Sequence, residues 1–206
     1  MYKPGDIFFT RVTDKCYEGW VEQALLWNIT AYQKGFLEMS PPACDVVHAG
    51  VVTDYPNGVH SRLSGGIQRL DLTKTYPEAL ILRHKDCMNN PLMGQHVAEE
   101  AEKLVGQKYD NWANLKFAFP VVHIWLSLLM KRPLNLKKLN CIGFAFQCLR
   151  NAGLKAGWYL PVEALTPGMG YLDENLYQVT SQGATCRILS STGEPGFVGR
   201  LRQQLQ

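Results

Sequence analysis

The chain lacks several features that would assign it to a class at once. It has no Cys-x-x-Cys pair among its six cysteines, which argues against a zinc ribbon and a thioredoxin-like redox motif. Its 21 basic and 18 acidic residues leave a net charge of only +3, with both signs interspersed. Repeats and low-complexity tracts are absent as well. Because nucleic-acid binding requires a concentrated basic surface, the sequence predicts no nucleic acid partner.

Long apolar segments are missing too. The start, Met1 to Asp6, has no secretory leader, so we expect a cytoplasmic, reducing location and cysteines that remain thiols. The apolar run at 117–130 is shorter than the roughly 20 residues that span a bilayer. We expect it to be a core or oligomer-contact helix, with a membrane-surface or acyl-chain contact as the alternative. The oligomeric state stays open.

What the chain does have is enough apolar residue for a full core. Its 206 residues are 46% hydrophobic, which predicts one domain. We place that domain at residues 1–189, with helical insertions at about 14–40 and 112–133 and a polar tail at 190–206. Alternation and turn residues predict strands at 5–12, 45–53, 59–63, 67–72 and 79–83, with a hairpin turn at 55–58.

Helical periodicity predicts two helices outside the segment around Cys141. The first spans residues 17–33, with Trp20, Val21, Ala24, Leu25 and Ile29 on its apolar face. The second runs from Pro91 to Val105, capped by Asn90 and ended by Gly106. The sequence therefore predicts an α+β protein.

The segment from Asn140 to Gly153 reads as a helix whose first turn carries a thiol. Asn140 is a suitable N-cap, and Gly153 is a suitable C-terminal stop. A cysteine at this place is close to the positive end of the helix dipole and to backbone N–H groups, which lower its pKa and can hold an oxyanion. We therefore take Cys141 as the candidate nucleophile. Cys148, two turns deeper on the same face, is expected in the core.

A thiol nucleophile needs a base and a group that orients the base. His48 is the best candidate base, because it lies within an apolar strand where an unpaired imidazole would be costly. Gly50 is expected to leave open space beside it. The paired strand brings His60 and Ser61 alongside, and a register slip of one residue decides which of the two faces His48.

The order of these residues resembles a known family. Gly5-Asp6-Ile7, then His48-Ala49-Gly50-Val51-Val52, then Tyr109-Asp110, and then Asn140-Cys141 are similar to the circularly permuted papain-like amidases. These are the YiiX-like relatives of the NlpC-type cell-wall peptidases, and lecithin:retinol acyltransferase-like enzymes share the arrangement. The resemblance covers most of residues 5–180. It includes residues 161–167, which are similar to the segment that follows the cysteine helix in such proteins. It implies a small antiparallel sheet or half-barrel packed against the helix that bears the nucleophilic cysteine.

The resemblance also implies roles. Cys141 would be the nucleophile, His48 the general base, and His60 the third catalytic residue, with Ser61 as the fallback. Tyr109 and the backbone N–H of Cys141 would form the oxyanion hole, although an aromatic packed under the helix end would look the same. No metal or cofactor is implied, and His84, His96 and His123 have no partner at ligand spacing.

Departures from the family pattern leave the substrate open. Ile142 stands where the cell-wall peptidases usually have serine, and the segments before Asp45 and before Cys141 are long and apolar. The leading hypothesis is a cysteine amidase or peptidase that cleaves a cell-wall peptide or a related amide through an acyl-enzyme. The alternatives are a lipid-directed acyltransferase or thioesterase, and an inactive binding module.

Overall fold

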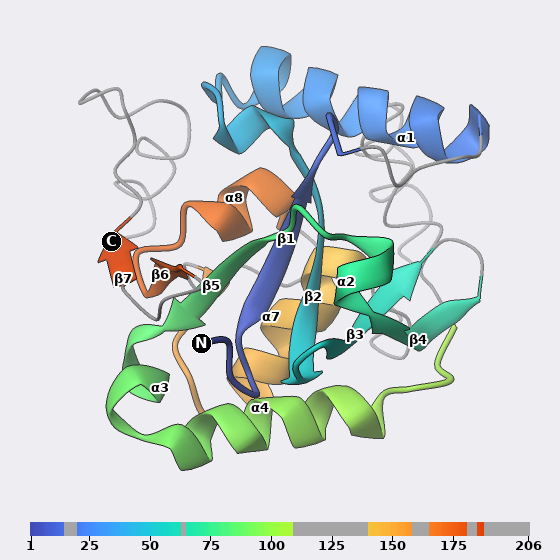
Figure 1. Cartoon of the computed structure of the whole chain (residues 1–206). Helices are drawn as coiled ribbons and strands as arrows, with labels where there is room; N and C mark the ends of the chain where they lie inside the picture. The colour runs from blue at the N-terminus through green and yellow to red at the C-terminus, as the bar shows by residue number, and fades with distance from the viewer. Residues whose placement is uncertain (15–19, 63–64, 109–139, 158–164, 181–184, 188–206) are drawn as a thin grey trace, which may run out of the picture.

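A computed structural model describes residues 1–14, 20–62, 65–108, 140–157, 165–180 and 185–187 (Figure 1). Several predicted features lie outside these ranges: Tyr109, His123, the insertion at 112–133 with its apolar run, and the tail at 190–206.

The described strands form one antiparallel sheet of seven, in the order β4-β3-β2-β1-β5-β6-β7. The five strands predicted from the first half of the chain are confirmed to within a few residues. Two later strands escaped prediction because each is only three or four residues long. The bounds are β1 (Ile7–Arg11), β2 (Val46–Asp54), β3 (Asn57–Arg62), β4 (Gly66–Asp71), β5 (Leu80–His84), β6 (Leu176–Val179) and β7 (Thr185–Arg187).

Helices border this sheet, so the predicted α+β class is confirmed. In Figure 1, α7 lies behind the central strands, while α1 and α4 border the upper and lower sides. No helix in the described ranges is long and apolar enough to cross a membrane. The bounds are α1 (Trp20–Ala31), the π-helical turn η1 (Tyr32–Phe36), the 3-10 turn η2 (Ala43–Asp45), α2 (Leu72–Thr75), α3 (Lys85–Asn89), α4 (Pro91–Lys103), α7 (Cys141–Asn151) and α8 (Pro167–Tyr171).

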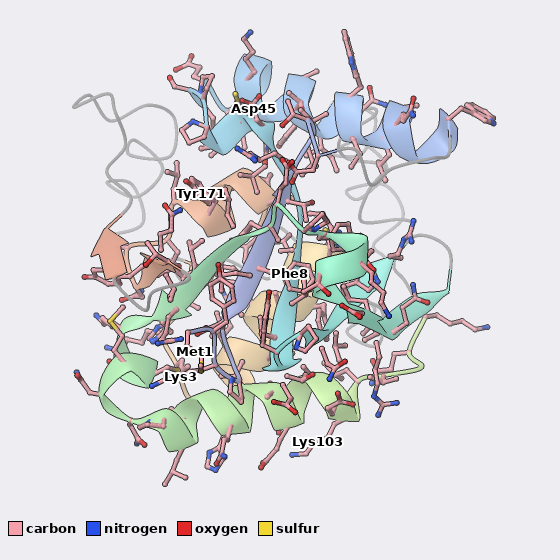
Figure 2. The ribbon with its side chains drawn as sticks, in the orientation of Figure 1. Met1, Lys3, Phe8, Asp45, Lys103 and Tyr171 are labelled. Carbon is pink, nitrogen blue, oxygen red and sulfur yellow. The ribbon has the colours of Figure 1, made fainter. Side chains whose placement is uncertain are left out.

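The two faces of the sheet carry different clusters. Ala49 and Val51 of β2 belong to the main core, which α4, α7 and α8 complete. Val52 of the same strand belongs to a smaller cluster with Phe8 and Tyr76 on the α2 side, where Figure 2 shows Phe8. Successive residues of a strand point to opposite faces, which explains why both sides of β2 are buried.

The predicted apolar face of α1 is wrong in part. Trp20 and Ala24 are exposed, whereas Ile29 is buried as predicted. It packs against Val47 together with Leu26, which was not predicted on this face. The helix is apolar over most of its circumference. Periodicity alone therefore did not determine which side would face the sheet.

Gln33 connects several elements at the upper side of the sheet. Its amide nitrogen donates to the carbonyls of Cys44 and Val46, both at 2.9 Å, and its amide oxygen accepts from Gly168 N at 2.6 Å. The side chain is completely buried. Gln33 thus links its own helix η1 to three other elements: η2, the start of β2 and α8.

Replacing Gln33 with leucine should lower the free energy of unfolding by about 3 kcal/mol, because three buried backbone groups would lose their partner. Urea unfolding monitored by circular dichroism measures the change. Gln95→Leu, on the exposed side of α4, is the matched control and should change stability by less than about 0.5 kcal/mol. A Gln33→Leu effect as small as that of the control would contradict the proposed connection.

Candidate functional site

The first turn of α7 has the predicted structure. Asn140 caps the helix, and its Oδ1 accepts from Gly143 N at 2.7 Å. Cys141 is the first helical residue and is 5% exposed. The helix ends near Gly153, whose φ of +83° is the left-handed value expected of a C-terminal glycine. The thiol is therefore located at the positive end of an eleven-residue helix.

His48 and His60 form a buried pair on β2 and β3. His48 Nε2 lies 3.0 Å from His60 Nδ1, and the rings are nearly perpendicular, with an interplanar angle of 81°. Pairing of Gly50 with His60 in the hairpin register puts both imidazoles on the same face of the sheet. One ring must donate and the other must accept, so each histidine orients the other.

Ser61 points to the opposite face, because it follows His60 in the strand. It is buried, but it does not share the side of the imidazoles. Of the two candidates for the third residue, the structure thus brings His60 to His48. The predicted open space at Gly50 is wrong: a Cβ there would overlap the ring of Phe8 and come within 2.6 Å of Val59 O.

The surroundings of the pair include two residues that the sequence did not single out. The Tyr76 hydroxyl lies 3.4 Å from His60 Nδ1, and its ring is 5.6 Å from that of His48. Gln68 of β4 pairs directly with His60 in the sheet register, and its amide nitrogen lies 3.4 Å from His60 Nε2. The Gly65-Gly66 bend, which sets the β3–β4 register, was the only sequence signal for Gln68.

Burial keeps both imidazoles neutral. Desolvation and the positive charge of Arg62 lower the pKa of His48 to about 3. Desolvation, with repulsion from His48 and Arg62, lowers the pKa of His60 to about 2. Near neutral pH each ring therefore carries one N–H, and a single hydrogen bond joins them.

Helix α7, which begins with Cys141, packs on the face of the sheet opposite to the histidine pair. Helix α7 packs against β2 and β3, and its apolar side chains share the core with Ala49 and Val51, whose neighbours in the strand include His48. Contact between the thiol of Cys141 and an imidazole stays a prediction.

The strands separate at this point. Pairing of β2 with β3 stops at Gly50 and His60; beyond it, β2 continues beside β1 and β3 beside β4. His48 thus lies beyond the last paired residues of β2 and β3.

The other candidates have structural roles. Cys148 is fully buried in the core, as predicted, and burial raises its pKa. Cys44 is also buried, and desolvation together with Asp45 raises its pKa. His84 pairs through Nε2 with Lys155 O at 2.9 Å, and its Nδ1 accepts from Asp86 N at the start of α3. In the described part of the chain no three His, Cys, Asp or Glu residues gather as metal ligands.

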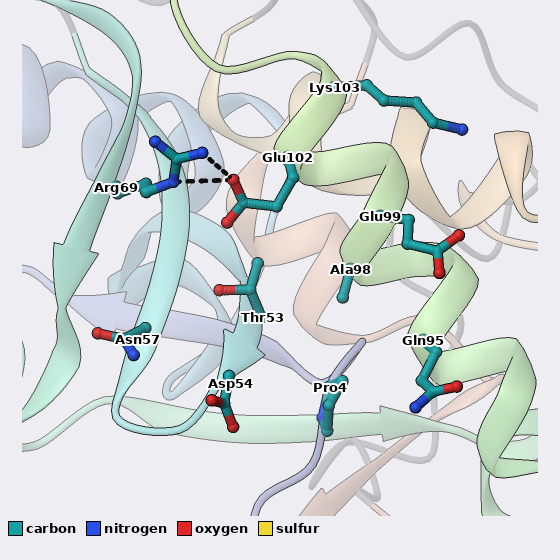
Figure 3. Close-up of a pocket in the computed structure, with 10 residues that line it drawn as sticks. All are labelled: Pro4, Thr53, Asp54, Asn57, Arg69, Gln95, Ala98, Glu99, Glu102 and Lys103. Carbon is teal, nitrogen blue, oxygen red and sulfur yellow. Dashed lines mark hydrogen bonds and ion pairs between the residues drawn. The ribbon is translucent and has the colours of Figure 1, made fainter.

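A surface groove of about 770 Å³ lies between α4 and the β2–β3 turn (Figure 3). Arg69 of β4 crosses it to Glu102 of α4, with Nη2 and Nε of Arg69 2.7 and 2.8 Å from Glu102 Oε2. Arg69 alternates with Gln68 along β4 and so faces away from the histidines. The groove is separate from the candidate site.

Comparison with models of protein families and with curated proteins finds no match to this chain.

The buried histidines should make the fold sensitive to acid. The unfolded chain takes up protons near pH 6.5, whereas the folded pair does so only near 3 and 2, so stability is fully present above pH 6.5 and falls as the pH drops toward 3. His60→Gln removes one of the two groups that take up a proton on unfolding. The slope of the free energy of unfolding against pH should therefore decrease by up to about 1.4 kcal/mol per pH unit. Urea unfolding at pH 7, 5 and 4 measures it.

His96→Gln, which alters an exposed histidine on α4, is the control and should keep the wild-type pH dependence. Equal slopes for wild type and His60→Gln would mean that His60 is not held neutral by the fold.

Proposed function

We propose that this chain is a cysteine hydrolase of the permuted papain-like type, which cleaves an amide or peptide bond through an acyl-enzyme. The observation that carries the proposal is the buried 3.0 Å contact between His48 Nε2 and His60 Nδ1, beside a helix that begins with Cys141. His84, by contrast, pairs with the backbone carbonyl of Lys155. Because His60 pairs with Nε2 of His48, the other ring nitrogen, Nδ1, can take the proton of the nucleophile.

The chemistry assigns one role to each residue. Nδ1 of His48 takes the Sγ proton of Cys141, and the thiolate attacks the carbonyl carbon to form a C–S bond. Backbone N–H groups in the first turn of α7 stabilise the oxyanion. When the C–N bond breaks, His48 returns its proton to the amine. His48 then takes a proton from water, which attacks the thioester. The C–S bond breaks, the carboxylic acid leaves, and the thiol of Cys141 is restored.

His60 orients the base in this proposal. With Nδ1 as acceptor, it holds Nε2–H of His48 and stabilises the imidazolium that forms in the reaction. The pKa values of the pair favour neutral rings at rest, so His48 begins as a base. Tyr109 keeps its proposed place near the oxyanion, outside the described residues. Cleavage of a cell-wall peptide or a related amide belongs to the same proposal.

Alkylation tests the nucleophile directly. With iodoacetamide between pH 5 and 9, Cys141 should react first, with an apparent pKa below the roughly 8.5 of a free thiol. Cys87 and Cys148 should react slowly, since burial raises the pKa of Cys87 to about 11 and encloses Cys148 completely. Mass spectrometry of the modified peptides gives the rates.

Two variants complete the test. His48→Ala should lower the Cys141 rate at pH 7 by at least about tenfold, because the thiol loses the base that takes its proton. His96→Ala is the matched control and should leave the rate unchanged. A Cys141 rate equal to that of Cys148, or one indifferent to His48→Ala, would refute the proposed nucleophile and base.

A second candidate function is acyl transfer or thioester cleavage on a lipid. Two tryptophans favour it: Trp20 and Trp27 are 81% and 76% exposed and lie seven residues apart on α1. Residues at this spacing share one helix face, and tryptophan is enriched at membrane–water interfaces. The same thiol and histidines would then transfer an acyl chain.

Flotation with vesicles of phosphatidylcholine and phosphatidylserine separates the two functions. A lipid-directed enzyme should float with the vesicles, and Trp20→Ala with Trp27→Ala should reduce the floating fraction severalfold. Leu92→Ala, which removes another exposed apolar side chain from α4, is the control and should have no effect. A wild-type protein that stays in the bottom fraction would exclude the lipid-directed function.

A further inference from the structure

We propose that Gln68 is a positioning residue, whose amide oxygen accepts from His60 Nε2–H and so keeps His48 Nδ1 unprotonated. This inference rests on the proposed function, because it gives the pair the proton arrangement that a base requires. It adds a fourth member to the group formed by Cys141, His48 and His60.

The contact geometry supplies the first step. The three polar side chains form a row across neighbouring strands: His48 on β2, His60 on β3 and Gln68 on β4. His60 and Gln68 are direct cross-strand partners, so their side chains leave the same face. Gln68 is half-buried at the outer end of the row. It is therefore placed to act on His48 only through His60.

The tautomers of the two imidazoles supply the second step. A neutral imidazole has one N–H, so the pair has two arrangements. If His60 Nδ1 accepts from His48 Nε2–H, then Nδ1 of His48 has its lone pair and Nε2 of His60 carries a proton. If His60 Nδ1 donates, then Nδ1 of His48 is protonated and cannot act as a base. The Tyr76 hydroxyl near His60 Nδ1 can donate or accept and so suits both arrangements.

Gln68 separates the two arrangements. In the structure its amide nitrogen faces His60 Nε2 at 3.4 Å, an orientation that suits the non-basic arrangement. Rotation of the amide by 180° about Cγ–Cδ, a broad and roughly two-fold torsion, presents the oxygen instead. The oxygen accepts from Nε2–H and selects the basic arrangement. The imidazolium state of His48 requires the same orientation, because its Nε2–H must also donate to His60.

Three side chains of similar size test this assignment. Gln68→Glu presents acceptors only, whereas Gln68→Met presents no amide. We expect Gln68→Glu to retain activity and Gln68→Met to lose at least about tenfold of the roughly 10²–10⁴-fold that a general base contributes. Turnover of p-nitrophenyl acetate, a small acyl ester, and the alkylation rate of Cys141 by iodoacetamide at pH 7 measure the loss. Arg69→Met, on the other face of β4, is the matched control.

Nitrogen-15 spectra of the histidine side chains give a readout that a purely structural role would not move. Wild type and Gln68→Glu should show His48 protonated on Nε2 and not on Nδ1, whereas Gln68→Met should show a mixture of the two forms. Arg69→Met should match wild type. A wild-type His48 protonated on Nδ1, or a Gln68→Met spectrum equal to that of wild type, would overturn the assignment to Gln68.

The two readouts distinguish this inference from the proposed function. If Cys141 shows no enhanced reactivity in any variant while the spectra change as expected, the hydrolase proposal fails and the role of Gln68 stands. If Cys141 is reactive and sensitive to His48→Ala but indifferent to Gln68→Met, the hydrolase stands and the role of Gln68 fails.

Discussion

The register of the β2–β3 hairpin is the constraint on which the candidate site depends. Gly50 opposite His60 puts the two imidazoles on one face, and their rings meet with a 3.0 Å contact. A slip of one residue would turn Ser61 toward His48 and His60 toward the α7 core. The register is held by burial on both sides: Val51 and Val59 pack in the main core, while Val52 packs with Phe8. A slip of β3 by one residue would turn Val59 away from the main core.

Burial explains why two histidines can adjoin without repulsion. In water each imidazole would be partly protonated near pH 6.5, and two charges at this distance would repel. Phe8 and Tyr76 surround the rings, and desolvation lowers both pKa values far enough to keep the pair neutral. Because the rings are neutral, each carries a single N–H, and a polar neighbour such as Gln68 can influence which ring nitrogen holds it.

The two faces of the sheet carry different groups of residues. One face holds the core with α4, α7 and α8, and the other holds the histidine row behind α2. His48 lies two residues beyond Gly50, the last residue of β2 that pairs with β3. Gln33 fixes the nearby start of β2 to α8 and η1. The position of His48 is therefore influenced by contacts that lie outside the candidate site.

The sequence by itself determined the local features. It fixed the first five strands, the cap by Asn140, and the place of Cys141 at a helix start, because each depends on residues within one turn or one strand. Tertiary structure decided what lies between distant segments: His60 and not Ser61 beside His48, the Phe8 ring over Gly50, Gln68 at the end of the row, and the exposed side of α1. These depend on pairing register and on competition between apolar surfaces for the same core, which no local pattern encodes.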